Sequence, residues 1–192
     1  MKATSASRFG AFVIDAIIVL FVSGLIVGFL PTTKKYDAAA EKQSELIDKI
    51  LSTEVELDKA YDEIYEIRYE LDKESIHITL VTIIIYLAYY GTFAYYKNGQ
   101  TLGKKLMRIK VEAENDSNMT FILRTAFIHG GFTALISVVG VLFLDKSAYA
   151  GLYAICSLVN FAILLISAIF CMVREDGKGL HDLLFKTSVI KE

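Results

Sequence analysis

Four long apolar runs constrain this chain more than any other feature of its sequence. Each holds more than twenty residues, the length that a helix needs to cross a hydrocarbon core of about 30 Å. Two runs contain no Asp, Glu, Lys or Arg, and the other two contain one such residue each, Asp15 and Arg124. The runs are Phe9–Leu30, Ile76–Tyr96, Phe121–Leu144 and Tyr149–Val173. The sequence therefore predicts an all-α membrane protein with four transmembrane helices.

Composition argues against several other classes of protein. A hydrophobic content of 54% and a single proline exclude a disordered chain. A net charge of −2, without a basic stripe interleaved with aromatic residues, gives no reason to expect nucleic-acid binding. The first run is longer than the apolar core of a signal peptide, which spans roughly 7–15 residues, so we interpret it as a retained helix. No catalytic, cofactor-binding or metal-binding motif stands out, and we expect neither an enzyme nor a bound cofactor or metal.

The charges of the connecting segments predict the orientation. Segment 97–120 holds five basic residues against three acids, whereas segment 31–75 holds seven basic residues against thirteen acids. By the positive-inside rule, the N-terminus, segment 97–120 and the C-terminal tail are cytoplasmic. The chain then begins with a cytoplasmic N-terminus and the first helix (1–30), an extracytoplasmic acidic insertion (31–75) and the second helix (76–96). A basic cytoplasmic loop (97–120), the third and fourth helices (121–173) and a cytoplasmic tail (174–192) follow.

The acidic insertion reads as helical. Apolar or small residues recur there on alternating four- and three-residue steps, which is a heptad pattern, at Leu46, Ile50, Thr53, Leu57, Ala60, Ile64, Ile67 and Leu71. A single helix of this length would carry its far end about 58 Å away, although both ends must return to the membrane. A hairpin with arms at about 38–51 and 54–75 fits better, and Thr53 and Glu56 have the spacing of a capping box at the start of the second arm. One long helix remains the alternative.

The insertion also offers a surface for a partner. Its apolar stripe leaves a lone hairpin with little core of its own, so we expect that stripe to contact another protein through Leu46, Ile50, Leu57, Ile64 and Leu71. The alternative is a solvated acidic spacer between the helices.

Asp15 is the most informative polar residue of the first run. It lies about 9 Å inside the span, where an aspartate costs about 2.5–3.5 kcal/mol to insert and is expected to face the interior of the bundle. We expect its partner to be Arg124 or His129 in the third span, or His181 in the tail, and Arg8 to reach lipid headgroups instead. Asp15 is then either a packing anchor or a carboxylate that binds a proton or cation.

The basic loop predicts contact with lipid. Lys104, Lys105 and Arg108 share one flank of a short helical segment whose other face carries leucines, a pattern suited to anionic lipids at the membrane surface. Beyond it, Ile109–Glu112 and Ser188–Lys191 each read as extended, and we predict that they pair into a two-stranded ribbon.

Three motifs together resemble the RDD family of bacterial membrane proteins, which is named for one arginine and two aspartates. The first is Ser7-Arg8-Phe9-x-Ala11-x-x-Ile14-Asp15. The second runs from Gly99-Gln100-Thr101-Leu102-Gly103-Lys104-Lys105 to Lys110-Val111. The third runs from Gly179-Leu180-His181-Asp182-Leu183-Leu184 to Thr187-x-Val189, which makes Asp182 the second aspartate. The chain departs from the family pattern in its acidic insertion, Tyr36–Ser75, and at Lys186, where a small residue, often glycine, is usual.

The resemblance implies a multi-pass protein of the bacterial inner membrane and associates Arg8, Asp15 and Asp182 with ion- or proton-coupled transport. Four helices are few to enclose a transport cavity, so this hypothesis also predicts a homo-oligomer or a companion membrane or secreted protein. The alternative hypothesis is a non-enzymatic scaffold or accessory subunit whose hairpin binds that partner. The sequence leaves the two nearly level.

Overall fold

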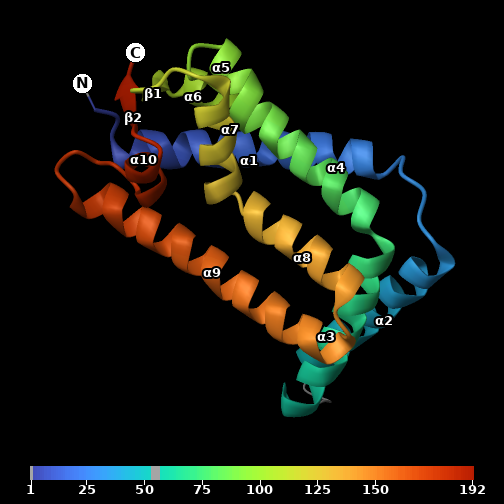
Figure 1. The fold of residues 1–192 in the computed structure, drawn as a ribbon. Coiled ribbons are helices and arrows are strands. Elements are labelled where there is room, and N and C mark those ends of the chain that lie inside the picture. The colour runs from blue at the N-terminus through green and yellow to red at the C-terminus, as the bar shows by residue number, and fades with distance from the viewer. Residues whose placement is uncertain (1, 53–56) are drawn as a thin grey trace.

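The computed structural model describes residues 2–52 and 57–192, with side chains for all of these except 57–59. Within this part of the chain, three helical stretches are long and apolar enough to cross a membrane. They are α1 (Ser5–Val27), the continuous stretch Ile76–Tyr96, which comprises α4 (Ile76–Tyr86), η1 (Leu87–Phe93) and α5 (Ala94–Tyr96), and α9 (Lys146–Val173). Figure 1 shows these stretches around the shorter helices α7 and α8.

The third apolar run, Phe121–Leu144, does not form the single helix that the sequence predicts. It is divided into α7 (Asn118–Ile128) and α8 (Gly131–Phe143), which meet at an angle of 67°. The break falls at Gly130, whose φ of +71° is a left-handed conformation that glycine adopts without a steric penalty. Taken together, the bent pair is apolar enough to count as a fourth span.

A π-helical turn interrupts the second span close to this break. Residues Leu87–Phe93 form η1, and Gly91 within it has no side chain to separate it from α7. A Cβ atom at Gly91 would lie 3.1 Å from the Cα atom of Ile122. The second span and α7 therefore pack backbone against backbone at this level.

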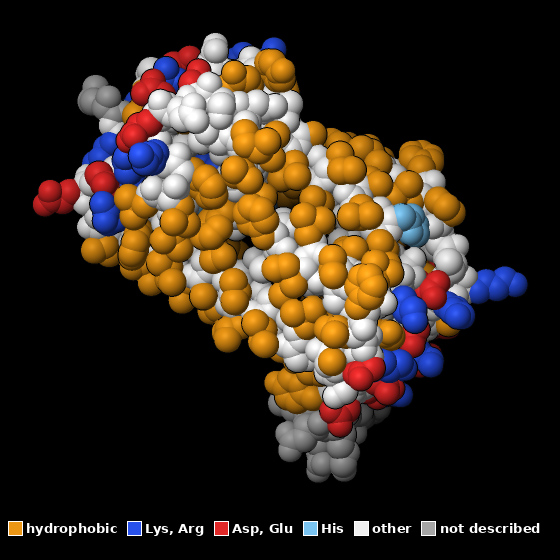
Figure 2. Space-filling model, in the orientation of Figure 1, with side chains coloured by type: hydrophobic (Ala, Val, Ile, Leu, Met, Phe, Trp, Pro, Cys, Tyr) orange, Lys and Arg blue, Asp and Glu red, His pale blue; other side chains and the backbone are white. Residues whose placement is uncertain are grey.

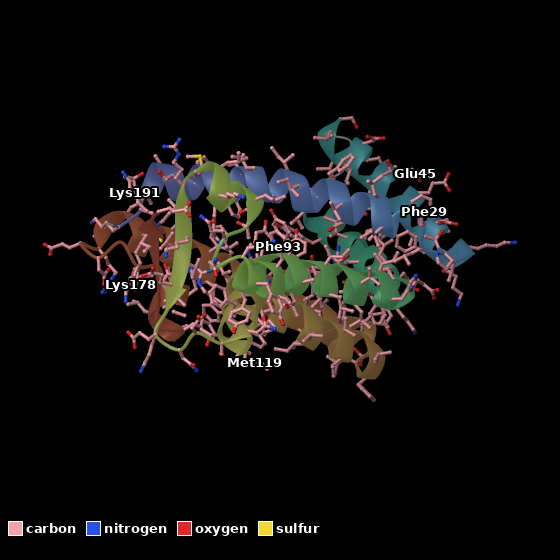
Figure 3. All side chains as sticks on the ribbon, turned by 90° about the horizontal axis from the view of Figure 1, so that it is seen from above. Phe29, Glu45, Phe93, Met119, Lys178 and Lys191 are labelled. Carbon is pink, nitrogen blue, oxygen red and sulfur yellow. The ribbon has the colours of Figure 1, made fainter. Side chains whose placement is uncertain are left out.

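Two short strands and two short helices gather at one end of the molecule, which we call the ribbon end. Strands β1 (Ile109–Ala113) and β2 (Thr187–Lys191) pair antiparallel, which confirms the predicted ribbon. Helices α6 (Leu102–Leu106) and α10 (Leu180–Leu184) lie beside them, and both chain termini lie here (Figure 1). Figure 3 places Lys178 and Lys191 toward this end and Phe29 and Glu45 toward the other.

The acidic insertion forms the opposite end, which we call the hairpin end. Helices α2 (Lys34–Leu51) and α3 (Leu57–Glu74) pack against each other, which confirms the predicted hairpin over one long helix. The proposed capping box of Thr53 and Glu56 lies outside the described residues. The buried residues between the two arms are Ala39, Leu46, Ala60, Ile67 and Leu71.

Most of the side chains in the predicted partner-binding stripe thus pack against each other inside the hairpin. Leu46 and Leu71 are buried between the arms and Ile50 packs against them, so these three side chains are not available as a docking surface. Ile64 is exposed, and the side chain of Leu57 lies outside the described residues. The expectation that a lone hairpin has too little core failed because the seam residues of the two arms face each other.

The base of the hairpin is fastened to α9. The Tyr149 hydroxyl donates a hydrogen bond of 2.6 Å to Asp72, and the Tyr149 ring meets that of Tyr69 edge to face at 5.5 Å. Lys146 forms an ion pair of 3.2 Å with Glu70. Between the two ends, hydrophobic side chains cover the surface in Figure 2, whereas charged side chains gather at the ends. This distribution suits a helical bundle that crosses a membrane.

Candidate functional site

Two arginines from different helices bind one aspartate at the ribbon end. Asp182 on α10 is fully buried. Its Oδ2 atom accepts a hydrogen bond of 3.2 Å from Nη1 of Arg8 on α1, and its Oδ1 atom accepts one of 2.9 Å from Nη2 of Arg124 on α7. This group, which we call the Asp182 cluster, joins three helices that are far apart in the sequence.

Uncharged donors complete the surroundings of Asp182. The Thr187 hydroxyl donates to Oδ1 at 2.9 Å, and the Gly179 amide donates to Oδ2 at 3.2 Å. Burial by itself raises the pKa of this carboxyl group, but the charge of Arg124 and the hydrogen bonds from Arg124 and Thr187 outweigh it, so the pKa lies well below its usual range. Asp182 is therefore ionised at neutral pH and acts as the fixed anion of the cluster.

His181 adjoins the cluster without adding charge to it. Its Nε2 atom lies 3.4 Å from Oδ1 of Asp182, and its Nδ1 atom lies 3.3 Å from the Ser167 hydroxyl on α9. Burial, and secondly the charge of Arg124, lower the pKa of His181 to about 3. The imidazole is therefore neutral at physiological pH.

Asp15 holds the start of α6 rather than a charged partner. Its Oδ1 atom accepts hydrogen bonds of 2.7 Å from both the Gly103 amide and the Tyr89 hydroxyl, and its Oδ2 atom accepts one of 2.5 Å from the Thr101 hydroxyl. Thr101 is also the N-cap residue of α6. A carboxylate at this position is stabilised by the free amide groups at the start of the helix.

The absence of a side chain at Gly103 makes this contact possible. A Cβ atom there would lie 2.4 Å from the Ala11 carbonyl oxygen and 2.8 Å from Asp15. The glycine of the second motif therefore allows α6 to reach the backbone of α1, and the aspartate of the first motif fastens it. The two motifs describe the two sides of one contact.

Several sequence predictions for this site are corrected by these contacts. Asp15 makes its hydrogen bonds to Tyr89, Thr101 and Gly103, not to Arg124, His129 or His181. Arg8 donates to Asp182 and to the Val189 carbonyl oxygen rather than extending to the lipid headgroups. The predictions failed because the short segment before α6 folds back against α1, which no helical periodicity reveals.

The predicted polar residues nevertheless converge on one space. A cavity of about 180 Å³, the ribbon-end cavity, is lined by charged and polar side chains from α1, η1, α6, α7, α9 and α10 and by apolar ones between them. The polar lining residues are Arg8, Asp15, Tyr90, Lys104, Arg124, Thr125, His129, Cys171 and His181. All the residues proposed from sequence as ion- or proton-binding line this cavity except Asp182, which is bonded to two of them.

Of the basic residues predicted to contact lipid, Lys104 turns inward. It is half-buried and lines the ribbon-end cavity, whereas Lys105 and Arg108 are exposed. Arg108 is not helical: it follows α6 with a φ of +54°. The three side chains therefore do not form the single basic flank that the helical pattern predicted.

Two further cavities continue from the first toward the hairpin end. The middle cavity, of about 270 Å³, shares His129 and Thr125 with the ribbon-end cavity and surrounds the break between α7 and α8. The hairpin-end cavity, of about 200 Å³, shares Thr79 and Ala134 with the middle one. Its polar lining residues are Arg68, Asp72, Thr79, Thr133, Ser137, Tyr149, Tyr153, Ser157 and Asn160.

His129 occupies the point where the first two cavities adjoin. Its ring stacks on that of Tyr90 with 4.1 Å between centroids and meets Tyr86 edge to face at 5.7 Å. Asn160 on α9 lies against the neighbouring Gly130, because a Cβ atom there would be 2.8 Å from the Asn160 amide nitrogen. The break in the helix is therefore surrounded by polar and aromatic side chains from three helices.

The site includes residues that sequence reasoning did not assign. Thr101 and Gly103 stand within the second motif, and Thr187 within the third, so the motifs themselves were the available signal. Tyr89 lies in an apolar run with many other tyrosines, and no pattern distinguishes it.

The fold and the site are those of a helical protein of the membrane type. A buried cluster of arginine and aspartate joins its first helix to its C-terminal tail. The chain belongs to the RDD family, whose family model matches residues 2–186, and this confirms the resemblance seen in the three motifs. No curated protein and no solved structure matches the chain.

Proposed function

We propose that this RDD protein is an ion transporter, or a subunit of one, in the bacterial inner membrane, with the ribbon end in the cytoplasm. The proposal rests on one observation: three adjoining cavities, each lined in part by polar side chains, follow one another from the ribbon end to the hairpin end, past a broken helix. The positive-inside rule supports the orientation, because the basic loop lies at the ribbon end.

The broken helix is the feature that favours transport over simple anchoring. Irregular backbone at membrane depth is tolerated where it is buried in protein or lines a water-filled cavity, and discontinuous helices form the substrate sites of many transporters. Here the break leaves the Gly130 carbonyl oxygen bonded to the Thr133 hydroxyl, with Asn160 beside it.

The charges at the ribbon end favour an anion as the transported ion. Around that cavity, Arg8, Lys104 and Arg124 exceed Asp15 and Asp182 by one positive charge. A cation passing this point would meet an unfavourable potential, whereas an anion would be concentrated there. In this proposal Asp15 and Asp182 do not carry the ion: they position α6, α10 and the arginines around its path.

Transport also calls for more than one copy or a companion. Three spans and one bent pair form a small bundle, and the exposed apolar side chains of α8 and α9 offer surfaces for assembly within the membrane, among them Leu142, Ile155 and Leu158. We therefore include a homo-oligomer or a companion membrane protein in the proposal.

Flux through reconstituted vesicles tests the proposal. Phosphatidylglycerol–phosphatidylcholine vesicles containing the full chain are loaded with potassium chloride or potassium phosphate, valinomycin supplies the counter-current of potassium, and light scattering reports efflux. Ser137→Phe fills the hairpin-end cavity and should abolish the flux. Leu142→Phe adds a ring on the exposed face of the same helix and should leave the flux unchanged.

Two results would count against the proposal. Efflux no faster than from protein-free vesicles for either salt would contradict transport of these anions. Equal flux in Ser137→Phe and wild type, with both proteins folded, would contradict the route through the cavities. A pH-sensitive dye in parallel vesicles detects proton movement. A signal from this dye without anion flux would identify the proton, and not an anion, as the transported ion.

The second candidate function is a membrane scaffold, and the outer face of the hairpin favours it. Ile47, Leu51, Tyr61 and Ile64 are exposed although the seam beneath them is already filled. Replacing these four residues by serine should remove a cross-linked companion protein from native membranes, while serine at the exposed Glu45 and Asp62 should not. Identical cross-linked species in both variants would contradict the scaffold.

A further inference from the structure

Lys104 is an unusual lysine because its side chain lines a cavity inside the protein rather than extending into solvent. Within the described part of the chain, its ammonium group makes no hydrogen bond or ion pair, although it is half-buried and lines the ribbon-end cavity. Such a group is costly to keep away from water unless an anion or ordered water joins it. The neighbouring carboxylates are already occupied, since Asp15 is bonded by three neutral donors and Asp182 by two arginines.

The arginines of the same cavity also retain donor capacity. Nε of Arg8 is buried and has no hydrogen-bond partner among the described residues. Arg124 uses Nε and Nη2 for Asp182 and Thr187, which leaves Nη1 without a bond in the same part of the chain. Three cationic side chains on α1, α6 and α7 thus line one cavity with donors to spare.

We propose that the ribbon-end cavity binds a phosphate group, held by Lys104 together with Arg8 and Arg124. A phosphate group offers several oxygen acceptors around one centre, which matches donors that approach from three helices. Its negative charge also balances the single positive charge in excess around the cavity. A carboxylate has fewer acceptor atoms and satisfies fewer of these donors.

The position of the cavity suits the phosphate of a membrane lipid as well as free phosphate. Arg8 lies in the first turns of α1, and Lys104 lies on the short helix beyond the second span, so the cations lie near the membrane surface. Phe12 and Leu164 line the same cavity and are about half exposed, at 51% and 48%, on helices whose outer faces are apolar. A lipid could place its phosphate on the cations and its acyl chains along these side chains.

Lys104 permits a clean test because, within the described part of the chain, its ammonium group holds no other group in place by a hydrogen bond or ion pair. Arg8 and Arg124 hold Asp182, so removing either would disturb the cluster itself. Lys104→Gln removes only the charge that the proposal assigns to the ligand. Lys105→Gln is its matched control, since Lys105 is the next residue of α6 and is exposed.

The experiment measures binding to the purified full chain in neutral detergent. Native mass spectrometry counts bound molecules, and thermal unfolding reports stabilisation, with three probes: inorganic phosphate, dioctanoyl phosphatidylglycerol and dioctanoyl phosphatidylcholine. We expect phosphatidylglycerol or inorganic phosphate to bind the wild type and Lys105→Gln alike. In Lys104→Gln, the loss of one charge-assisted contact should weaken that binding about tenfold or more.

The probes also separate the two sources of phosphate. Binding of inorganic phosphate without the lipid identifies a free anion, and binding of phosphatidylglycerol without inorganic phosphate identifies a lipid site. Equal binding of phosphatidylcholine, whose own cation offsets its phosphate, would overturn the proposal, as would no binding of any probe. Equal loss in both lysine variants would also overturn it, because the effect would then come from general surface charge.

The inference deepens the proposed function but does not need transport to be true. If the chain carries an anion, a phosphate-bearing compound is the class that this cavity selects. Binding that depends on Lys104, with no flux in vesicles, would leave the phosphate site standing and contradict transport alone. Flux through the wild type, with no binding of any phosphate probe to the wild type, would contradict the phosphate site and leave transport standing.

Discussion

Different kinds of interaction stabilise the two ends of this molecule. At the ribbon end, residues from the first, second and third motifs meet through buried charges, and each contact joins segments far apart in the sequence. At the hairpin end, two adjacent helices close an apolar seam, and most charged pairs lie at the surface. The family pattern coincides with the first kind of region, and the acidic insertion with the second.

This difference indicates at which residues a substitution should be tolerated and at which it should destabilise the fold. A buried carboxylate between two arginines leaves uncompensated charge when it is removed, whereas a surface ion pair is worth little. An apolar seam tolerates changes that keep its volume, and its loss stays local. The ribbon end should therefore unfold as one cooperative unit, whereas the hairpin should be able to unfold while the ribbon end stays folded.

The largest effect is expected for Asp182→Asn. The change leaves Arg8 and Arg124 buried without their anion, which should destabilise the fold by about 3–5 kcal/mol. Thermal unfolding in detergent measures it. Asp176→Asn breaks an exposed pair with Arg174 in the same tail and should change little. Similar melting temperatures for both variants would show that the buried cluster adds nothing to stability.

The next largest effect is expected for Leu46→Ala at the other end. Leu46 is 3% exposed in the hairpin seam, and its truncation should cost about 2–4 kcal/mol. Hydrogen exchange should accelerate in α2 and α3 and remain slow in β1 and β2. The control Leu51→Ala removes a side chain that is 77% exposed. Faster exchange at the ribbon as well would mean that the two ends are one cooperative unit.

The same contrast explains how much the sequence could predict. The hairpin and three of the four long apolar helices follow from periodicity and length, which are local properties, and these were predicted correctly. The ribbon followed from two short extended segments, one in the middle of the chain and one near its C-terminus. The break at Gly130 was missed because hydropathy averages over a window, although two adjacent glycines, Gly130 and Gly131, marked it.

The partners of the buried charges could not be read from periodicity. Asp15 was correctly singled out as a residue that needs partners, but its donors come from a turn and a short helix. Which of several cations approaches Asp182 depends on how four helices cross, and the motifs name the residues without giving their pairing. In the sequence, Lys104 looks equivalent to its neighbour Lys105. The two side chains differ only in the direction in which they leave the short helix, and the structure alone shows that Lys104 is half-buried and Lys105 exposed.

A pH effect of intermediate size is expected at the ribbon end. Burial, and secondly the charge of Arg124, lower the pKa of Lys104 to about 8, against the opposing effect of Asp15 and Asp182. The ammonium is therefore lost as the pH rises through 8, and phosphatidylglycerol binding should weaken about tenfold between pH 7 and pH 9. The phosphodiester keeps its charge over this range, so the change comes from the protein.

Lys104→Gln tests the assignment of that pH dependence. The other charged or titratable groups around Lys104 remain in this variant, namely Arg8, Asp15, Tyr90, Arg124, His129, Cys171, His181 and Asp182. Binding to Lys104→Gln should be weak and independent of pH from 7 to 9. A pH dependence that persists in the variant would assign the titration to one of those groups instead.

The smallest effect concerns Lys186, where the chain departs from the family pattern. Its φ of +48° lies in the left-handed region, where glycine fits without strain. Lys186→Gly should relieve that strain but add freedom to the unfolded chain, for a net gain of about 0.5–1 kcal/mol. At the hairpin end, Asp62→Gly in the exposed middle of α3 should instead cost about 0.5–1 kcal/mol. Opposite shifts in melting temperature would confirm that the ribbon end tolerates a side chain where its turn requires glycine geometry, and shifts of the same sign would contradict it.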